Sequence, residues 1–176
     1  MANVFLSYHH NDEHLARRLE LYLENKQHKF KIKAGEKPPG DWRLVFANAL
    51  EASDAAVFLL SESGLSSHHV LGQLGSAKVF QKTRGMLILP VVVGKYDIPD
   101  IVSDITCYEL AAGNDKELAK LSDELDRAIS GYLKATSRAP SVFVSHRHKD
   151  KQVVSALITL LESAFEIQKT DIRCTS

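Results

Sequence analysis

The stretch AAVFLL, residues 55–60, is an unbroken apolar run of the length of a β-strand. Two more apolar runs, NVFLSY at residues 3–8 and MLILPVVV at residues 86–93, precede and follow it in the chain. Strands that are buried on both faces are apolar at nearly every position, whereas strands with one exposed face alternate apolar and polar residues. The three runs therefore predict the central strands of a sheet that is covered on both sides.

Segments with helical spacing separate these strands. Four helices are expected. The first begins at Asn11–Asp12 and ends near Lys26, and the second runs from Trp42 through Leu50. The third and fourth cover residues 69–81 and 115–134. Shorter strands are expected at residues 29–33 and 106–110, and SESGLSS, residues 61–67, is expected to be a loop. Alternating strands and helices predict an α/β fold with an open, mainly parallel five-stranded sheet and helices on both faces, flavodoxin-like in outline.

Ligands of such sheets bind at the carboxyl ends of the strands. Three loops form that rim here: SYHHND from residue 7, AGEKPPGDW from residue 34, and SESGLSSHH from residue 61. A flavodoxin-like receiver domain would need an acidic cluster or a phosphate loop there, but only Asp12 follows the first strand. Gly72 and Gly75 lie within an expected helix, so they indicate close helix packing and not a phosphate loop.

Composition excludes several classes of protein. The 176 residues include 22 Lys+Arg and 22 Asp+Glu, so the chain lacks the basic excess of a nucleic-acid binder. The N-terminus has no signal-peptide pattern, and the longest apolar run is far too short to span a bilayer. We therefore expect a cytoplasmic protein that binds neither nucleic acid nor membrane. His9, His10 and His14 have no cysteine or acidic third ligand in view, so no metal site is expected.

The end of the chain repeats its beginning. SVFVSHRHKDKQVVSALITLLES, from residue 141, aligns without gaps with NVFLSYHHNDEHLARRLELYLEN, from residue 3. Identical pairs such as Phe143 with Phe5 and Asp150 with Asp12 share one offset of 138 residues. The expected organisation is a domain at residues 1–135, a linker at 136–140, and a fragment at 141–176 that resembles the first strand and helix of a second copy.

Four segments in this order resemble a Toll/interleukin-1 receptor (TIR) domain. They are VFLSYHHND, KPPGDW, ALEASDAAVFLLSES and HHVLGQLGSAKV, and the resemblance covers residues 3 to about 134. It is greatest to the TIR domains of bacterial defence systems. The resemblance implies cleavage of NAD at the nicotinamide–ribose bond, in some members with cyclisation of the ADP-ribose. It also implies immune signalling that depends on assembly with other TIR domains into a homo-oligomer or filament, with NAD as substrate or ligand and no permanently bound cofactor.

The catalytic position of this family departs from the enzymatic pattern. Enzymatic TIR domains carry a glutamate in the third helix, often four residues after a tryptophan, and His69 and Gln73 stand at these positions. Cleavage develops positive charge on the ribose, which a carboxylate stabilises and a neutral amide does not. We therefore expect an inactive or attenuated chain. The glutamine either replaces a native glutamate or belongs to a non-enzymatic assembly or nucleotide-binding module; Glu62 is the nearest substitute carboxylate or else a solvated loop residue.

The remaining candidate residues surround this position. The resemblance places Tyr8, His9 and His10 at the nicotinamide end of the ligand, although Tyr8 also suits a core position and the histidines a solvated loop. AGEKPPGDW resembles the loop that gates the site and mediates contacts between domains. Lys37 and Arg43 are candidates for the pyrophosphate. Trp42 is a candidate for stacking on the dinucleotide, or alternatively a partly buried core residue.

Overall fold

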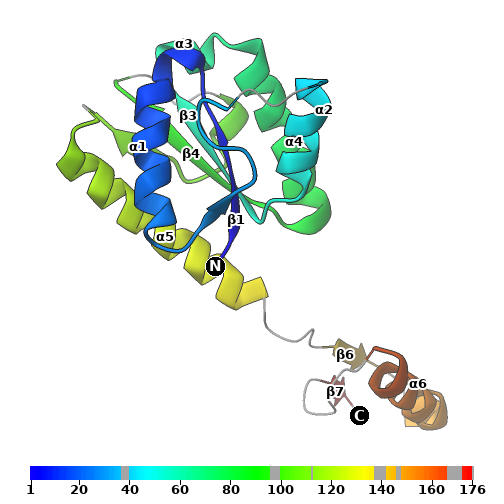
Figure 1. Cartoon of the computed structure of the whole chain (residues 1–176). Helices are drawn as coiled ribbons and strands as arrows, with labels where there is room; N and C mark the ends of the chain where they lie inside the picture. Colours follow the sequence, from blue (N-terminus) through cyan, green and yellow to red (C-terminus); the bar gives the residue numbers. More distant parts are fainter. Residues whose placement is uncertain are drawn as a thin grey trace. The chain divides into compact units, whose positions relative to one another are not determined.

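The structure is a computed structural model that describes residues 1–36, 40–95, 100–111, 113–136, 142–145, 148–165 and 172–175. The chain divides into two compact units, Met1–Leu133 and Lys134–Ser176. The first unit contains the sheet and its covering helices, which Figure 1 colours from blue to yellow.

The first unit has one five-stranded sheet in which every strand pair is parallel. In spatial order its strands are β2 (Lys29–Phe30), β1 (Asn3–Ser7), β3 (Ala55–Leu60), β4 (Leu87–Val93) and β5 (Tyr108–Leu110). The predicted open parallel sheet is thus confirmed. All six residues of β3 are buried, as its apolar sequence requires. The two edge strands are shorter than predicted, because each pairs with only one neighbour over two or three residues.

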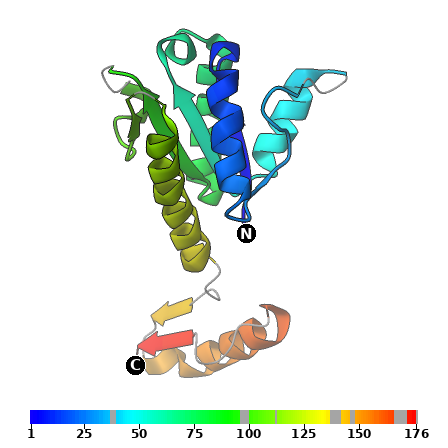
Figure 2. The same ribbon diagram turned by 60° about the vertical axis from the view of Figure 1, so that its left-hand side comes forward.

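Helices cover both faces of the sheet (Figures 1 and 2). On one face α1 (Glu13–Glu24) and α5 (Asp115–Thr136) bury an apolar cluster that includes Leu19 and Leu121. On the other face α2 (Trp42–Glu51) and α4 (His68–Arg84) bury a second cluster around Phe58 and Leu74. Successive residues of a strand point to opposite faces, so each central strand supplies side chains to both clusters.

Short helical turns occupy the connections between these elements. They are the 3₁₀ turns η1 (His10–Asp12) and η2 (Asp100–Val102) and the single-turn helix α3 (Glu62–Leu65). α3 corrects the prediction of a loop over residues 61–67. Its N-cap is Ser61, whose hydroxyl oxygen accepts a hydrogen bond from the Gly64 N–H at 3.0 Å, which is the usual function of a serine before a helix.

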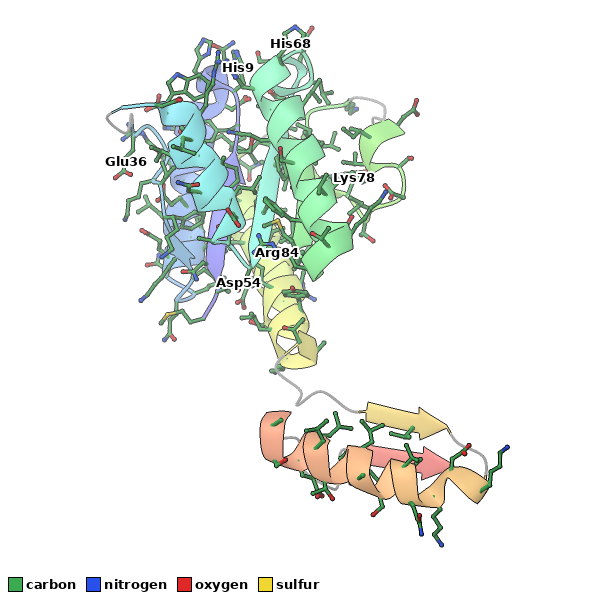
Figure 3. All side chains as sticks on the ribbon, turned by 90° about the vertical axis from the view of Figure 1, so that its right-hand side faces the viewer. His9, Glu36, Asp54, His68, Lys78 and Arg84 are labelled. Atoms are coloured by element: carbon green, nitrogen blue, oxygen red, sulfur yellow. The ribbon has the colours of Figure 1, made fainter. Side chains whose placement is uncertain are left out.

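Capping residues place the first turns of α2 and α4 at the carboxyl end of the sheet. The Asp41 carboxylate accepts the N–H of Arg43 at 3.1 Å, so α2 begins at Trp42. Ser67 caps α4 in the same way, and Gly85 ends it in a left-handed conformation with φ of 74°. Figure 3 shows His9 and His68 at one end of the first unit, with Asp54 and Arg84 toward the other.

The second unit repeats the element order of the start of the chain. It consists of β6 (Val142–Ser145), the 3₁₀ turn η3 (His148–Asp150), α6 (Lys151–Phe165) and β7 (Ile172–Thr175). The end of β6 and the starts of η3 and α6 each lie 138 residues after their counterparts in β1, η1 and α1. β7 pairs with β6 in parallel, as β2 pairs with β1. That this unit belongs to a second TIR domain stays a prediction.

Candidate functional site

Two adjoining pockets open at the carboxyl end of β1. We call the first the strand-end pocket; its volume is about 220 Å³. It is lined by the end of β1, the start of α1, the segment after β2, and α2 and α4, through Leu6, Ser7, Tyr8, His10, Glu13, Ile32, Lys33, Gly35, Glu36, Trp42, Phe46, His69 and Gln73. The second, the interhelical groove, lies between α2 and α4 and has a volume of about 310 Å³. Four side chains line both pockets, namely Trp42, Phe46, His69 and Gln73.

Gln73 lies at the junction of the two pockets and is fixed by the end of β1. The Ser7 hydroxyl donates a hydrogen bond to Gln73 Oε1 at 2.6 Å. Ser7 is only 2 % exposed, because it follows Phe5 on the face of β1 that α2 and α4 cover. The amide oxygen is therefore held by the protein, while the amide nitrogen of Gln73 keeps its hydrogens free of the described residues and available to a ligand.

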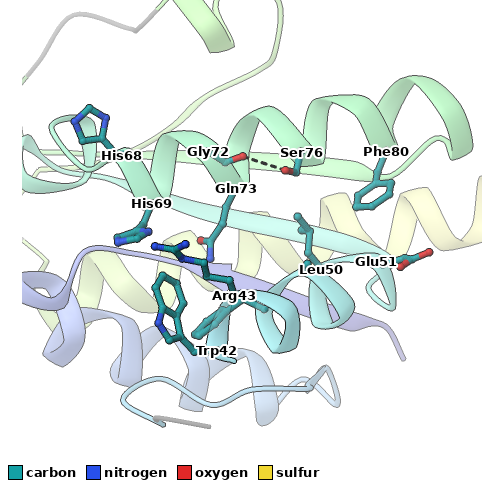
Figure 4. A pocket seen from close by; sticks show the side chains of 12 residues that line it. Trp42, Arg43, Leu50, Glu51, His68, His69, Gly72, Gln73, Ser76 and Phe80 are labelled. Carbon is teal, nitrogen blue, oxygen red and sulfur yellow. Dashed lines mark hydrogen bonds between the residues drawn. The ribbon is translucent and has the colours of Figure 1, made fainter. Parts of the chain in front are cut away.

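Trp42 and His69 form an aromatic wall between the two helices. Their ring centroids lie 4.8 Å apart in an edge-to-face arrangement, which is a favourable geometry for two aromatic rings. The Trp42 side chain is 39 % exposed, so a large part of the indole is open to a ligand. Arg43 places its guanidinium carbon 5.4 Å from the centre of the Trp42 ring (Figure 4).

Tyr8 anchors the segment that follows β2. The Gly35 N–H donates to the Tyr8 hydroxyl oxygen at 2.5 Å, and the Ala34 N–H donates to Glu20 Oε2 at 2.9 Å. Burial raises the pKa of the Tyr8 phenol, so it stays protonated. Gly35 has φ of 83°, and a Cβ atom there would collide with the side chain of Arg17. The Arg17 side chain could move aside, but the positive φ would strain any other residue, so this position favours glycine. Lys37, the predicted pyrophosphate ligand, lies outside the described residues.

The two histidines after β1 have different surroundings. His10 lines the strand-end pocket, whereas His9 lines neither pocket and uses Nδ1 to accept the Asn11 N–H at 3.2 Å. Their ring centroids are 3.9 Å apart. Over the described residues, no group of three His, Cys, Asp or Glu side chains is arranged to bind a metal ion.

The carboxylates of the strand-end pocket are Glu13 and Glu36, and sequence reasoning missed both. Glu13 Oε1 forms an ion pair with Arg17 at 2.6 Å, and Glu36 Oε2 accepts the Lys33 N–H at 2.9 Å. Glu62 begins α3 and is not among the described residues that line either pocket. Glu13 directly follows the first rim loop and Glu36 lies within the second, and these positions are the signal that would have found them.

Gly72 lines the interhelical groove and does not support close helix packing. No heavy atom lies within 4 Å of a Cβ built at Gly72 or at Gly75. The expectation that these glycines let helices approach closely is therefore wrong for the first unit as described. Gly72 instead leaves the α4 side of the groove without a side chain.

The parallel sheet, its two helical layers and a pocket at the carboxyl strand ends define a flavodoxin-like α/β domain. A family model for the TIR domain matches residues 4–125. The chain belongs to the TIR domain family.

Structural comparison agrees with this assignment at the level of the fold. The TIR domain of the Toll-related receptor TRR-2 from Hydra magnipapillata matches with a TM-score of 0.56 at 17% identity, over 73% of this chain and 96% of that one. A putative quinone reductase from Klebsiella pneumoniae gives a TM-score of 0.43 at 12% identity, over 80% of this chain and 88% of that one, which is too low for any conclusion. Curated proteins gave no match. No helix within the described ranges is long and apolar enough to cross a membrane.

Proposed function

We propose that this chain is a TIR domain of the NAD-using type, which binds NAD in the strand-end pocket and cleaves it slowly or not at all. The observation that carries the proposal is the position of Gln73. It lies on α4, lines both pockets together with Trp42 and His69, and accepts a hydrogen bond from Ser7 at the end of β1. A ligand in the strand-end pocket can therefore contact this amide.

The residues around Gln73 suit the nicotinamide riboside half of NAD. The exposed indole of Trp42 offers a flat apolar surface for a ring. His10, which also lines the pocket, offers an imidazole that can donate a hydrogen bond to a ligand oxygen. The free amide hydrogens of Gln73 can be donated to a ribose hydroxyl, so shape and hydrogen bonding favour binding.

The same residues explain weak chemistry. Cleavage of the nicotinamide–ribose bond leaves a developing positive charge on the ribose, and the strongest help comes from a fixed negative charge beside it. Gln73 carries none. Of the two carboxylates that line the pocket, Glu13 is paired with Arg17 and Glu36 accepts the Lys33 N–H, and neither has the position of Gln73. The pocket is therefore better equipped to hold NAD than to break it.

Assembly with other TIR domains, in bacterial immune signalling, is the cellular part of this proposal. The amide at Gln73 specifically favours a second form of it, in which the domain binds the nucleotide without cleaving it and acts only through assembly. The two forms differ in one measurable quantity, the release of nicotinamide.

The test uses the single tryptophan of the chain. Trp42 lines both pockets, so its fluorescence should change in a saturable way when NAD is added. Nicotinamide release, followed by chromatography in the same samples, should be very low. Because no other tryptophan is present, Trp42→Phe is the optical blank, and calorimetry with that variant shows whether NAD still binds. Absence of NAD binding to the native chain by both methods would overturn the proposal.

A further inference from the structure

We propose that the interhelical groove is a second subsite of the same ligand, which binds the planar base at the far end of the dinucleotide. This inference rests on the proposed function, because it assigns the strand-end pocket to the nicotinamide riboside half. It adds a binding surface on α2 and α4 that includes Arg43 and Phe80.

The volumes of the two pockets indicate that a dinucleotide would need both of them. Ligand sites usually have volumes of about 300–1,000 Å³. The strand-end pocket, at about 220 Å³, is below this range, and the interhelical groove, at about 310 Å³, is at its lower limit. A ligand as large as a dinucleotide needs more room than either offers. Trp42, Phe46, His69 and Gln73 line both, so the two spaces adjoin at these four side chains. One extended ligand that occupied both would pass over the contact between Trp42 and His69.

The order of side chains along the groove matches the order of groups in a dinucleotide. Figure 4 shows the side chain of Arg43 reaching toward His69 and Gln73, with Leu50 and Phe80 farther along the two helices. Seven residues separate Gln73 from Phe80 on α4, or about 10 Å at the helical rise of about 1.5 Å per residue. Along the groove, a ribose at Gln73 is therefore followed first by the guanidinium of Arg43 and then by the apolar side chain of Phe80.

Each of these positions has a matching chemistry. A guanidinium binds phosphate oxygens through two parallel hydrogen bonds. Arg43 forms no ion pair with a described residue; it lies over the Trp42 ring and is free to turn toward an anion. Farther along, Phe80 is only partly buried, and the buried Leu50 lies in the wall of the groove beside it. The guanidinium of Arg84 lies 4.6 Å from the centre of the Phe80 ring, so a planar, uncharged base would lie against the part of this ring that is still exposed. Arg43 would thus hold the pyrophosphate between the two subsites.

Two glycines of α4 provide a matched test. Gly72 lines the groove and Gly75 does not, yet a Cβ meets no atom at either position. Gly72→Leu should therefore fill the groove, whereas Gly75→Leu should leave it open; both should fold, since leucine is a better helix former than glycine. Ser76→Leu fills the same groove from an exposed position one turn later and replaces Gly72→Leu if that variant does not fold.

Calorimetry compares two probes, NAD and nicotinamide mononucleotide, which lacks the second base. The native chain and Gly75→Leu should bind NAD at least about tenfold more tightly than the mononucleotide, a difference of about 1.4 kcal/mol. Gly72→Leu should lose this advantage and bind the mononucleotide as before. Equal affinity of the native chain for both probes, or an unchanged NAD advantage in Gly72→Leu, would overturn the second subsite while the proposed function stands. If neither probe binds the native chain, both proposals fail.

Discussion

Replacing Gln73 by glutamate should convert this binding site into an active one. The two side chains have nearly the same shape, and the Ser7 hydroxyl that now donates to Gln73 Oε1 at 2.6 Å can donate equally to a carboxylate oxygen. A hydrogen bond to an ionised acceptor is stronger than one to a neutral amide. We therefore expect the variant to fold as the native chain does, with the new charge held in the same place.

The size of the effect follows from the charge alone. One preorganised group that stabilises charge in a transition state is worth about 10²–10³ in rate, or roughly 2.7–4 kcal/mol. Gln73→Glu should therefore raise the rate of nicotinamide release at saturating NAD by about this factor over the native chain, with similar affinity for NAD. The rate must be measured over a range of protein concentrations, because activity in this family is expected to depend on assembly.

A second glutamine of α4 supplies the control. Gln81→Glu makes the same chemical change two turns later, at a residue that is not among the described residues of either pocket. It should leave nicotinamide release unchanged. The reasoning is refuted if Gln73→Glu binds NAD without added turnover, or if the native chain already cleaves NAD rapidly. In the second case Glu13 and Glu36, and not Glu62, are the next carboxylates to replace.

Three further predictions concern stability. Burial raises the pKa of the Glu20 carboxyl above its ordinary value of 4.5. The folded state therefore binds this proton more readily than the unfolded state does. The free energy of unfolding should rise as the pH falls through the raised pKa toward 4.5. Glu20→Gln should make the free energy of unfolding less dependent on pH in that range, and it should raise the urea midpoint at pH 7. A lower urea midpoint at pH 7 would contradict this. Leu19→Ala, at a residue with no exposed surface, should lower the free energy of unfolding by about 2–5 kcal/mol. Leu157→Ala, at the corresponding position of the repeat, which is 40 % exposed, should lower it by about 0.5 kcal/mol or less. Equal losses in chemical unfolding would show that α6 is covered in solution. A chain that ends at Thr136, the last residue of α5, should keep the thermal unfolding transition of the first unit, and loss of that transition would show that the second unit is part of the same core.

The central part of the fold was predictable because its information is local. β3 and β4 are apolar at every position and β1 is apolar at its three central positions, and this composition is sufficient to indicate strands buried on both faces. The lengths of β2 and β5 were not predictable, because an edge strand ends where its one neighbour stops pairing. α3 was missed because four residues are too few to show a helical period.

The site was predictable only as far as strand ends determine it. Tyr8, His10 and Trp42 come from two of the rim loops and line one pocket, since the carboxyl ends of parallel strands meet at one edge. Gln73 lines the same pocket from α4, and only the resemblance to TIR domains pointed to it. The hydrogen bond from Ser7 to Gln73 joins residues 66 positions apart and has no local signal. The interhelical groove was also invisible, because it arises from the spacing of α2 and α4 and from the missing side chain at Gly72.

The repeat shows that burial depends on neighbours and not on sequence alone. Leu19 on α1 has no exposed surface, because α5 supplies Leu118, Leu121 and Leu125 to the same cluster. Leu157 occupies the matching position of α6, yet it is 40 % exposed, and Val153 nearby is 71 % exposed. The described part of the second unit contains counterparts of β1, β2 and α1 but none of α5. The exposure of Val153 and Leu157 therefore agrees with the absence of an α5 counterpart from the described part of this unit.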